Sequence, residues 1–388
     1  MNLKIKCGHV ADLVSGKDEK NVDIYIQDGK IEKISKNTSE KAKNEIDLSE
    51  YYIIPGFVDA HNHLCFDVGD EVKQIGEALG YQALIAARNA RIAINSGVTT
   101  LRDAGERGYV DFCVKRGVDE GLIPGPRLLA AGPGLMRTGG HMWFMGEEAD
   151  GESEVRKAVR GQLKAGADFI KIFVSGGATS QRTGSVTPEM TREEIETAIY
   201  EAHAAGKKAG AHTHGGIAAT WAIKAGVDAI EHGCFLTEEQ MLLMKDNGTF
   251  LVVTSGIQRA IAECPENSPF MREKAAAAYA NYLTVIKRAV QLGLRMALGN
   301  DTNHGCIAEE IAFVERAGMS RREALLAATR YGADLCGLES LTGTIEPGKE
   351  ADLIAFASNP LTADIRELTP QWVIRSGKTL KTPHGIHC

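Results

Sequence analysis

Eight short apolar segments recur along the middle of the chain, and they constrain the fold more than any other feature. Each begins or ends near a glycine, and stretches with helical periodicity lie between them; one of these, TREEIETAIYEAHAAG, opens with a capping-box pattern. Strands that alternate with helices form parallel sheets, and eight such units close into a barrel. The sequence therefore predicts an α/β fold with a (β/α)8 TIM barrel. Its strands are expected at 56–61, 97–103, 126–132, 167–175, 207–213, 227–233, 248–255 and 294–301.

The two ends of the chain differ from this middle part. KNVDIYIQDGKIEKIS, near the N-terminus, has an Asp-Gly pair between two alternating runs, and QWVIRSGKTLKT, near the C-terminus, has a Gly-Lys pair in a similar place. Both patterns are typical of β-hairpins. Strand-rich ends of this kind predict one small β-sandwich domain formed by both terminal segments. We expect its parts to be residues 1–54 and 343–388, with the barrel at 55–342.

Composition narrows the class of protein. Hydrophobic residues make up 44% of the chain and charged residues 24%, as in ordinary globular proteins, and the net charge of -7 favours neither nucleic acid nor a membrane surface as a partner. No apolar run is long enough to span a membrane, and the N-terminus lacks the features of a signal peptide. Eight cysteines are scattered singly, with no C-x-x-C pair, which is typical of reduced thiols. We expect a cytoplasmic enzyme with a small-molecule substrate, and a homo-oligomer.

Potential metal ligands stand near the carboxyl ends of five predicted strands, the edge at which such barrels carry their chemistry. Side chains two residues apart in a strand share a face, so His61 and His63 point the same way, as do His212 and His214. A single histidine in such a place would more often be structural. The recurrence predicts a metal site instead. The six candidate ligands are His61 and His63 on the first strand, Lys171 on the fourth, His212 on the fifth, His232 on the sixth and Asp301 on the eighth.

The chemistry of these residues favours two metal ions. His61, His63 and Asp301 can hold one divalent ion, and His212 with His232 supplies nitrogen ligands for a second. An ammonium at Lys171 would be costly in an apolar strand and would repel both ions. Carboxylation by CO₂ would turn this lysine into an anion with two oxygens that bridges the pair. We therefore predict two divalent cations, with Zn²⁺ as the first candidate and manganese, iron or cobalt also feasible, and a CO₂-derived carbamate on Lys171.

Six motifs together resemble the amidohydrolase superfamily of metal-dependent hydrolases: PGFVDAHNH, DFIKIFVSGG, AGAHTHG, AIEHG, LGND and GTIEPGKEADLIAF. The resemblance covers essentially the whole chain. It implies that the more buried ion is held by His61, His63 and Asp301, the more exposed ion by His212 and His232, and both by carboxylated Lys171. With those ligands we expect hydrolysis of a C–N amide bond by a metal-bridging hydroxide, with Asp301 as the catalytic proton carrier.

The substrate is less constrained. The resemblance is strongest to the branch of Xaa-Pro and Xaa-Arg/Lys dipeptidases and imidazolonepropionase-like proteins, which implies a dipeptide, an N-acyl amino acid or a cyclic amide. His141, in the glycine-rich loop with GGHMW, is a candidate to hold the substrate carbonyl or oxyanion, or else an exposed loop histidine. His214 is a candidate substrate contact. Arg137, Arg182 and Arg259 are either partners of a substrate carboxylate or solvated surface charges. We expect a substrate that carries a carboxylate.

Other functions stay open at this point. A deaminase of amino-heterocycles is the main alternative, although such enzymes generally use one metal, lack the bridging lysine and carry a glutamate shortly after the fifth-strand histidine, where this chain has THGGI. Lactone or phosphotriester hydrolysis would use the same machinery. A Schiff-base lyase would need the lysine but not the histidines around it. A non-catalytic barrel that serves as a scaffold is expected to have lost ligands, and this chain retains all six.

Overall fold

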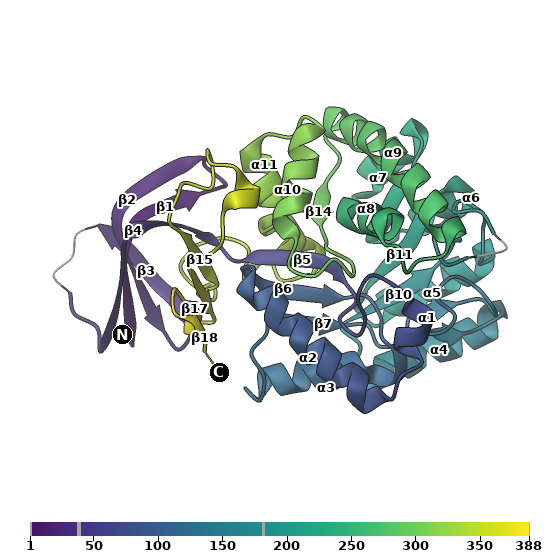
Figure 1. Ribbon diagram of the computed structural model, residues 1–388, viewed down its shortest axis with the longest axis horizontal. Coiled ribbons are helices and arrows are strands. Elements are labelled where there is room, and N and C mark those ends of the chain that lie inside the picture. Colours follow the sequence, from purple (N-terminus) through teal and green to yellow (C-terminus); the bar gives the residue numbers. More distant parts are fainter. Residues whose placement is uncertain (1, 37–39, 181–182, 388) are drawn as a thin grey trace.

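The computed structural model describes residues 2–36, 40–180 and 183–387 (Figure 1). All eight predicted barrel strands are present, in the predicted order and close to the predicted positions. They are β5 (Phe57–Asn62), β6 (Val98–Asp103), β7 (Arg127–Ala130), β10 (Phe169–Phe173), β11 (Lys208–Gly215), β12 (Ala229–Phe235), β13 (Phe250–Val253) and β14 (Met296–Leu298). The predicted α/β barrel is confirmed.

The barrel strands form two parallel sets that meet at two seams. β5, β6 and β7 form one set, and β14, β13, β12, β11 and β10 form the other, which two short strands, β8 (Leu135–Met136) and β9 (Glu147–Glu148), extend. At one seam the Asp168 amide donates to the Ala130 carbonyl at 2.9 Å. At the other the Asp301 amide donates to the His61 carbonyl at 2.8 Å. Closure of the barrel therefore places the end of the last strand against the end of the first.

Helices connect the strands and cover the outside of the barrel (Figure 1). Thr191 and Glu194 make the predicted capping box, because the Thr191 hydroxyl accepts from the Glu194 amide at 3.3 Å and the Glu194 carboxylate accepts from the Thr191 amide at 2.7 Å. The helices are α1 (Glu71–Ile75), α2 (Leu79–Asn95), η1 (Arg107–Tyr109), α3 (Val110–Asp119), α4 (Gly151–Ala165), α5 (Arg192–Ala204), α6 (Gly216–Lys224), α7 (Glu238–Asn247), α8 (Ser255–Glu263), α9 (Pro269–Leu292), α10 (Ile307–Arg316), α11 (Arg321–Ala327), α12 (Arg330–Leu335) and η2 (Ile365–Glu367).

The two terminal segments meet in a separate sheet beside the barrel (Figure 1). Its order is β18-β17-β16-β15-β4-β1-β2-β3, and β15 from the C-terminal segment pairs antiparallel with β4 from the N-terminal one. Both predicted hairpins occur, with turns at Asp28–Gly29 and Ser376–Gly377 whose residues all have positive φ. The strands are β1 (Leu3–Asp12), β2 (Lys17–Gln27), β3 (Lys30–Lys36), β4 (Asn44–Pro55), β15 (Leu353–Phe356), β16 (Trp372–Arg375), β17 (Lys378–Thr382) and β18 (Gly385–Ile386).

The terminal sheet has a hydrophobic core of its own, which includes Ile5, Ile24 and Ile374. β4 ends at Pro55 and β5 begins at Phe57. The domain limits at 54/55 and 342/343 stay predictions. Among the described residues no helix is both long and apolar enough to cross a membrane. The seven described cysteines are free thiols, and Cys388 lies outside the described residues.

Glu310 of α10 fixes the start of α8, which lies next to the barrel mouth. Its carboxylate accepts from the Ser255 amide at 2.8 Å, from the Ser255 hydroxyl at 2.8 Å and from the Gly256 amide at 2.5 Å. These amides have no partner within α8 because they open the helix, and the Glu310 oxygens satisfy them. Glu310 therefore anchors a helix that, as shown below, contributes side chains to the central cavity.

The same contact predicts a pH dependence of stability. Burial raises the pKa of Glu310 to about 7, from 4.5. The folded protein therefore holds this proton more tightly than the unfolded chain, and the contribution of Glu310 to stability is complete below its unfolded pKa and lost as the pH rises through 7. We take the free energy of unfolding of Glu310→Gln minus that of wild type. We expect this difference to rise by about 2 kcal/mol from pH 5 to pH 8, because only wild type loses the contribution of the Glu310 proton. Urea unfolding measures it, with Glu309→Gln as the control, and a difference that does not change with pH would contradict it.

Candidate metal centre

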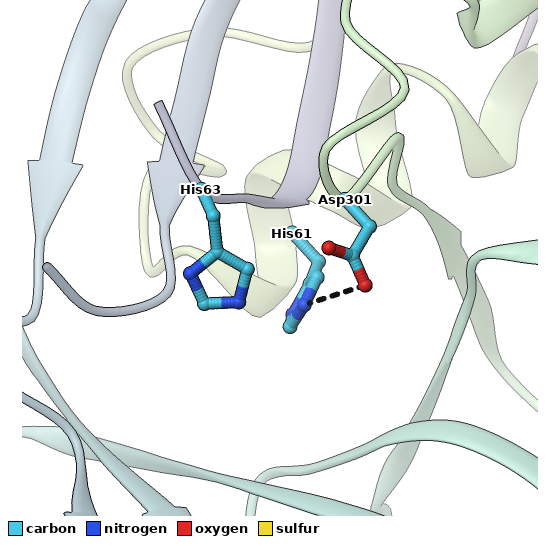
Figure 2. Close-up of side chains that lie close together, drawn as sticks. All are labelled: His61, His63 and Asp301. Atoms are coloured by element: carbon cyan, nitrogen blue, oxygen red, sulfur yellow. Dashed lines mark ion pairs between the residues drawn. The ribbon is translucent and has the colours of Figure 1, made fainter. Parts of the chain in front are cut away.

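The six predicted ligands come together inside the carboxyl end of the barrel. Figure 2 shows His61, His63 and Asp301, from the seam between β5 and β14, around one space. His61 Nε2 lies 3.6 Å from Asp301 Oδ2, and ligand atoms of all three residues lie within 4.8 Å of one another. The His232 ring centroid lies 4.9 Å from that of His61 and 4.7 Å from that of His212. Strands that are far apart in sequence thus present five of the candidates to one another.

His61 has an arrangement that favours a bound cation. Its side chain is fully buried, and neither ring nitrogen has a hydrogen-bond partner. A buried polar atom without a partner costs about 1–3 kcal/mol, so native proteins rarely leave one unsatisfied. Burial and Lys171 lower the pKa of His61, but the Glu231 and Asp301 carboxylates outweigh them and the net shift is upward. A dication bound to a ring nitrogen of His61 would give that nitrogen a partner, as a proton does. The donor set of two imidazoles and a carboxylate fits zinc.

Two of the other histidines are oriented so that one ring nitrogen stays free. His63 Nδ1 donates to the Gly105 carbonyl at 3.0 Å, which leaves the lone pair on Nε2. His212 Nε2 donates to the Gly176 carbonyl at 3.3 Å, which leaves the lone pair on Nδ1. Burial lowers the pKa of His63 to about 3 and that of His212 well below its ordinary value. Both are therefore neutral imidazoles, the form that binds metals.

His232 and Asp301 are held in unusual backbone conformations. Both have positive φ, of 72° and 55°, which is rare outside glycine; His232 lies within β12 and Asp301 follows the end of β14. His232 Nδ1 is hydrogen bonded to the Thr254 hydroxyl at 2.7 Å. Burial opposes a charge on Asp301, but His61, His63 and His232 outweigh it and hold the pKa of Asp301 well below its ordinary value. Asp301 is thus an anion aimed at imidazoles.

Asp59, on β5 two residues before His61, is a positioning residue. Its carboxylate accepts from the Asn300 amide at 3.0 Å, from the Asn300 side chain at 2.8 Å and from the Asn62 side chain at 2.8 Å. Asp59 therefore connects the end of β5, which bears His61, to the segment after β14, which bears Asp301.

Lys171 belongs to a buried charge network. Its Nζ forms an ion pair with Glu231, and Glu231 also accepts from Arg102 at 2.7 Å; Lys171 and Glu231 are at most 1% exposed and Arg102 is 2% exposed. The sequence reasoning missed Glu231 and Arg102. The available signal was a charged residue inside each of two apolar strands, TLRD and AIEHG. Burial lowers the pKa of Lys171, against the influence of Glu231. The ion pair is thus another way to neutralise the buried lysine.

A second group of buried acids lies behind His63. Asp103 and Glu106 are fully buried, and with His63 they bring ligand atoms within 4.8 Å of one another. Burial raises the pKa of both carboxyls, and the charges of Glu106 and Asp111 raise that of Asp103 further. Gly105, whose carbonyl orients His63, lies between the two acids in the chain, and the Glu106 carboxylate accepts from the Cys65 amide at 3.0 Å.

The two predicted substrate contacts lie beside the ligands. His141 is 7% exposed, so it is not an exposed loop histidine, and its ring centroid lies 4.3 Å from that of His212. Its Nδ1 is hydrogen bonded to the Thr179 hydroxyl at 2.6 Å, and a side chain on Gly177 would collide with the ring. The ring of His214 lies 5.1 Å from that of His212, with its Nδ1 buried and without a partner.

The cavity at this centre has a volume of about 40 Å³, with a hydrophobic part made by Phe66, Met142, Phe173, Ala178, Ile257 and Ile261. A second cavity, of about 260 Å³, lies next to it and shares Glu71 and Thr179 with it. Neither Arg137 nor Arg259 is among the lining residues that the structure describes, and Arg182 lies outside those residues. Glu71 and Gln258 line the central cavity and were missed, because α1 and α8 carry no sequence motif.

Comparison with known proteins agrees with this geometry. Residues 52–380 match the model of the amidohydrolase family. Ochratoxinase from Aspergillus niger is 32% identical over 374 residues, which cover 85% of this chain and 76% of that protein. Imidazolonepropionase from Symbiobacterium thermophilum is 26% identical over 347 residues, which cover 81% of this chain and 76% of that protein.

Among solved structures, a Xaa-Pro dipeptidase with methionine bound in its active site superimposes with a TM-score of 0.90 at 31% identity, covering 98% of this chain and 99% of that one. The family match spans most of the chain. It includes the whole barrel and strands β15 and β16 of the terminal sheet, and β1, β2 and β3 lie outside it. The chain belongs to the amidohydrolase family.

Proposed function

We propose that this protein hydrolyses a C–N amide bond in a small molecule, a dipeptide, an N-acyl amino acid or a cyclic amide, with the help of two divalent cations. The observation that carries the proposal is the convergence of four neutral or unpaired imidazoles and the Asp301 carboxylate on one buried space. The relatives include an ochratoxinase, an imidazolonepropionase and a Xaa-Pro dipeptidase, which supports this class of reaction. In the proposed arrangement His61, His63 and Asp301 hold the buried ion, His212 and His232 hold the second ion, and Lys171 bridges them as a carbamate.

The cations would supply a nucleophile at neutral pH, a bridging hydroxide, and would polarise the amide carbonyl. The chain supplies the rest. Asp301 is an anion beside the ligands, so it can take a proton and deliver it to the leaving nitrogen. His141 stands next to His212 with its Nδ1 fixed by Thr179, so its other nitrogen can donate to the oxygen on which charge develops.

Carboxylation of Lys171 rests on the need for an anion between two cations. The ion pair with Glu231 shows that charge balance alone does not require the modification. The amine must lose its proton before it reacts with CO₂, and burial of Lys171 favours that step by lowering its pKa. Arg102, which pairs with Glu231, would then remain to balance that carboxylate.

A substrate screen tests the proposed reaction. Protein loaded with Zn²⁺ is incubated with dipeptides, N-acyl amino acids, cyclic amides and amino-heterocycles, with chelator-treated protein as the control. We expect hydrolysis of amides by the loaded protein and none after chelation. Release of ammonia from a heterocycle, with every amide untouched, would favour the deaminase alternative instead.

The role of His141 gives a separate prediction. His141→Phe keeps the size of the ring but removes its hydrogen bonds, and we expect it to lower kcat by about 10²-fold, as the loss of one oxyanion donor does. Thr179→Val, which only frees the His141 ring, should lower kcat less. Steady-state kinetics with the best substrate from the screen measure both. An unchanged kcat in His141→Phe, at unchanged metal content, would show that His141 has no part in the reaction.

The cellular location, the charge of the substrate and the oligomeric state stay proposals. We propose a cytoplasmic location from the pattern of single cysteines. A carboxylate on the substrate and a homo-oligomeric state are expectations from the sequence.

A further inference from the structure

Glu71 is a buried carboxylate at the central cavity that the proposed reaction does not use. It opens the short helix α1 and is only 7% exposed. It lines both the central cavity and the adjoining cavity of about 260 Å³, so it stands where the two meet. No hydrogen bond or ion pair joins its side chain to any residue that the structure describes. Buried carboxylates of this kind normally have a partner.

The surroundings of Glu71 favour a cation as that partner. Asp70 and Glu266 also line the adjoining cavity, and the described residues around both cavities include no lysine or arginine. Helix α9, whose first residues line the adjoining cavity, does bear a nearby ammonium, on Lys274. That group already donates to three backbone carbonyls, those of Gly177 at 3.3 Å, Ser180 at 2.5 Å and Thr183 at 2.7 Å. It is therefore occupied in holding the loop that carries Thr179.

The electrostatics agree with this placement. Burial, together with the charges of Asp301 and Asp70, raises the pKa of Glu71 to about 8. The carboxylate is thus poorly stabilised when no positive group is present, and a cation bound beside it would relieve the cost of its charge. Gln258, 5% exposed and also without a described hydrogen-bond partner, lines the same cavity and offers a neutral polar contact.

We propose that Glu71 is a specificity-determining residue that binds a protonated amine of the substrate, so that the preferred substrates are amides with a free ammonium beside the scissile carbonyl, such as unblocked dipeptides, rather than N-acyl amino acids. This inference rests on the proposed amide hydrolysis and chooses among its candidate substrates. The hydrophobic side chains in the cavity, including Ile257, Ile261 and Met142, fit an apolar side chain on the residue that bears the amine.

Binding of a simple ligand pair tests the proposal without any turnover. Leucine and 4-methylpentanoate share a carbon skeleton and a carboxylate, which can take the place of the scissile carbonyl, and differ only in the amine. We expect Zn²⁺-loaded wild type to bind leucine at least about tenfold more tightly, since a hydrogen bond between charged groups is lost with the amine. Glu71→Gln should lose this preference while it binds 4-methylpentanoate as before. Calorimetry gives both affinities.

Matched variants keep the test decisive. Glu77→Gln removes an exposed charge six residues away that lines neither cavity, and should keep the preference for leucine. Glu71→Asp should keep part of it. Equal affinity of wild type for the two ligands, equal loss of both in Glu71→Gln, or loss of metal from Glu71→Gln would overturn the proposal.

A hydrolysis comparison separates this inference from the reaction itself. We expect unblocked dipeptides with an N-terminal leucine to be cleaved faster than their N-acetyl forms by wild type, with the gap reduced at least about tenfold in Glu71→Gln. Faster cleavage of the N-acetyl forms by wild type would overturn the inference and leave the reaction intact. If no amide of either kind is cleaved, the proposed reaction fails, and the leucine preference in binding still decides the role of Glu71.

Discussion

Asp301→Asn is expected to lower kcat by about 10³-fold, because asparagine keeps an oxygen near the ligands but can neither accept nor deliver a proton. Asp301 lies 3.6 Å from His61 Nε2 and 3.8 Å from His232 Nδ1, at the seam where the barrel closes. Its charge also helps to hold a buried cation, so part of the effect can come from weaker metal binding. Steady-state kinetics at saturating Zn²⁺, with elemental analysis of the same samples, separate the two contributions.

A suitable control is Asp119→Asn, because Asp119 is exposed at the end of α3, and its activity should match that of wild type. An Asp301→Asn protein that retains its metal and works within a few-fold of wild type would mean that the proton is carried by another group.

Lys171→Ala is expected to lose at least about 10³-fold in kcat/KM, since it removes the proposed bridge between the two cations. The substitution also leaves space in a fully buried site beside Glu231 and Phe173. A small carboxylate such as acetate or propionate has two oxygens like a carbamate, and we expect it to restore part of the activity when added at millimolar concentration. The activity of the variant as a function of carboxylate concentration measures the rescue.

Lys171→Met serves as the matched control, because its side chain fills the space and should block rescue. Isotopically labelled bicarbonate gives an independent test, since wild type loaded with metal should show a labelled carbamate by NMR. Full activity in Lys171→Ala without added carboxylate would exclude the bridging role, whatever the label shows.

The barrel and the candidate ligands could be identified in the sequence because both depend on local patterns. Each strand carries its own apolar run, and each candidate ligand lies within or just after such a run, toward the edge where parallel strands end. His61, Lys171 and Asp301 are therefore found by counting along single strands, and closure of the barrel brings them together. The pairing of the two terminal segments was predictable for a similar reason, since both ends showed hairpin patterns.

The remaining features depend on contacts between distant segments. Glu231 pairs with Arg102 across 129 positions and with Lys171 across 60, and no local pattern says that three charged residues on different strands will face one another. Glu71 lies on a five-residue helix in a segment without periodicity, and only the packing of that segment over the barrel mouth buries its carboxylate. The sequence also could not show which arginine, if any, contacts a substrate carboxylate, because the positions of loops are set by tertiary packing.

The number of metal ions per chain tests the central claim most directly. Protein purified without chelator is analysed by elemental analysis, alongside a His212→Ala/His232→Ala double variant and a His61→Ala/His63→Ala double variant. The account predicts two divalent ions per chain in wild type and a loss of one or more ions in each double variant. A wild-type protein that binds no divalent ion even after incubation with Zn²⁺, or variants whose metal content equals that of wild type, would contradict it.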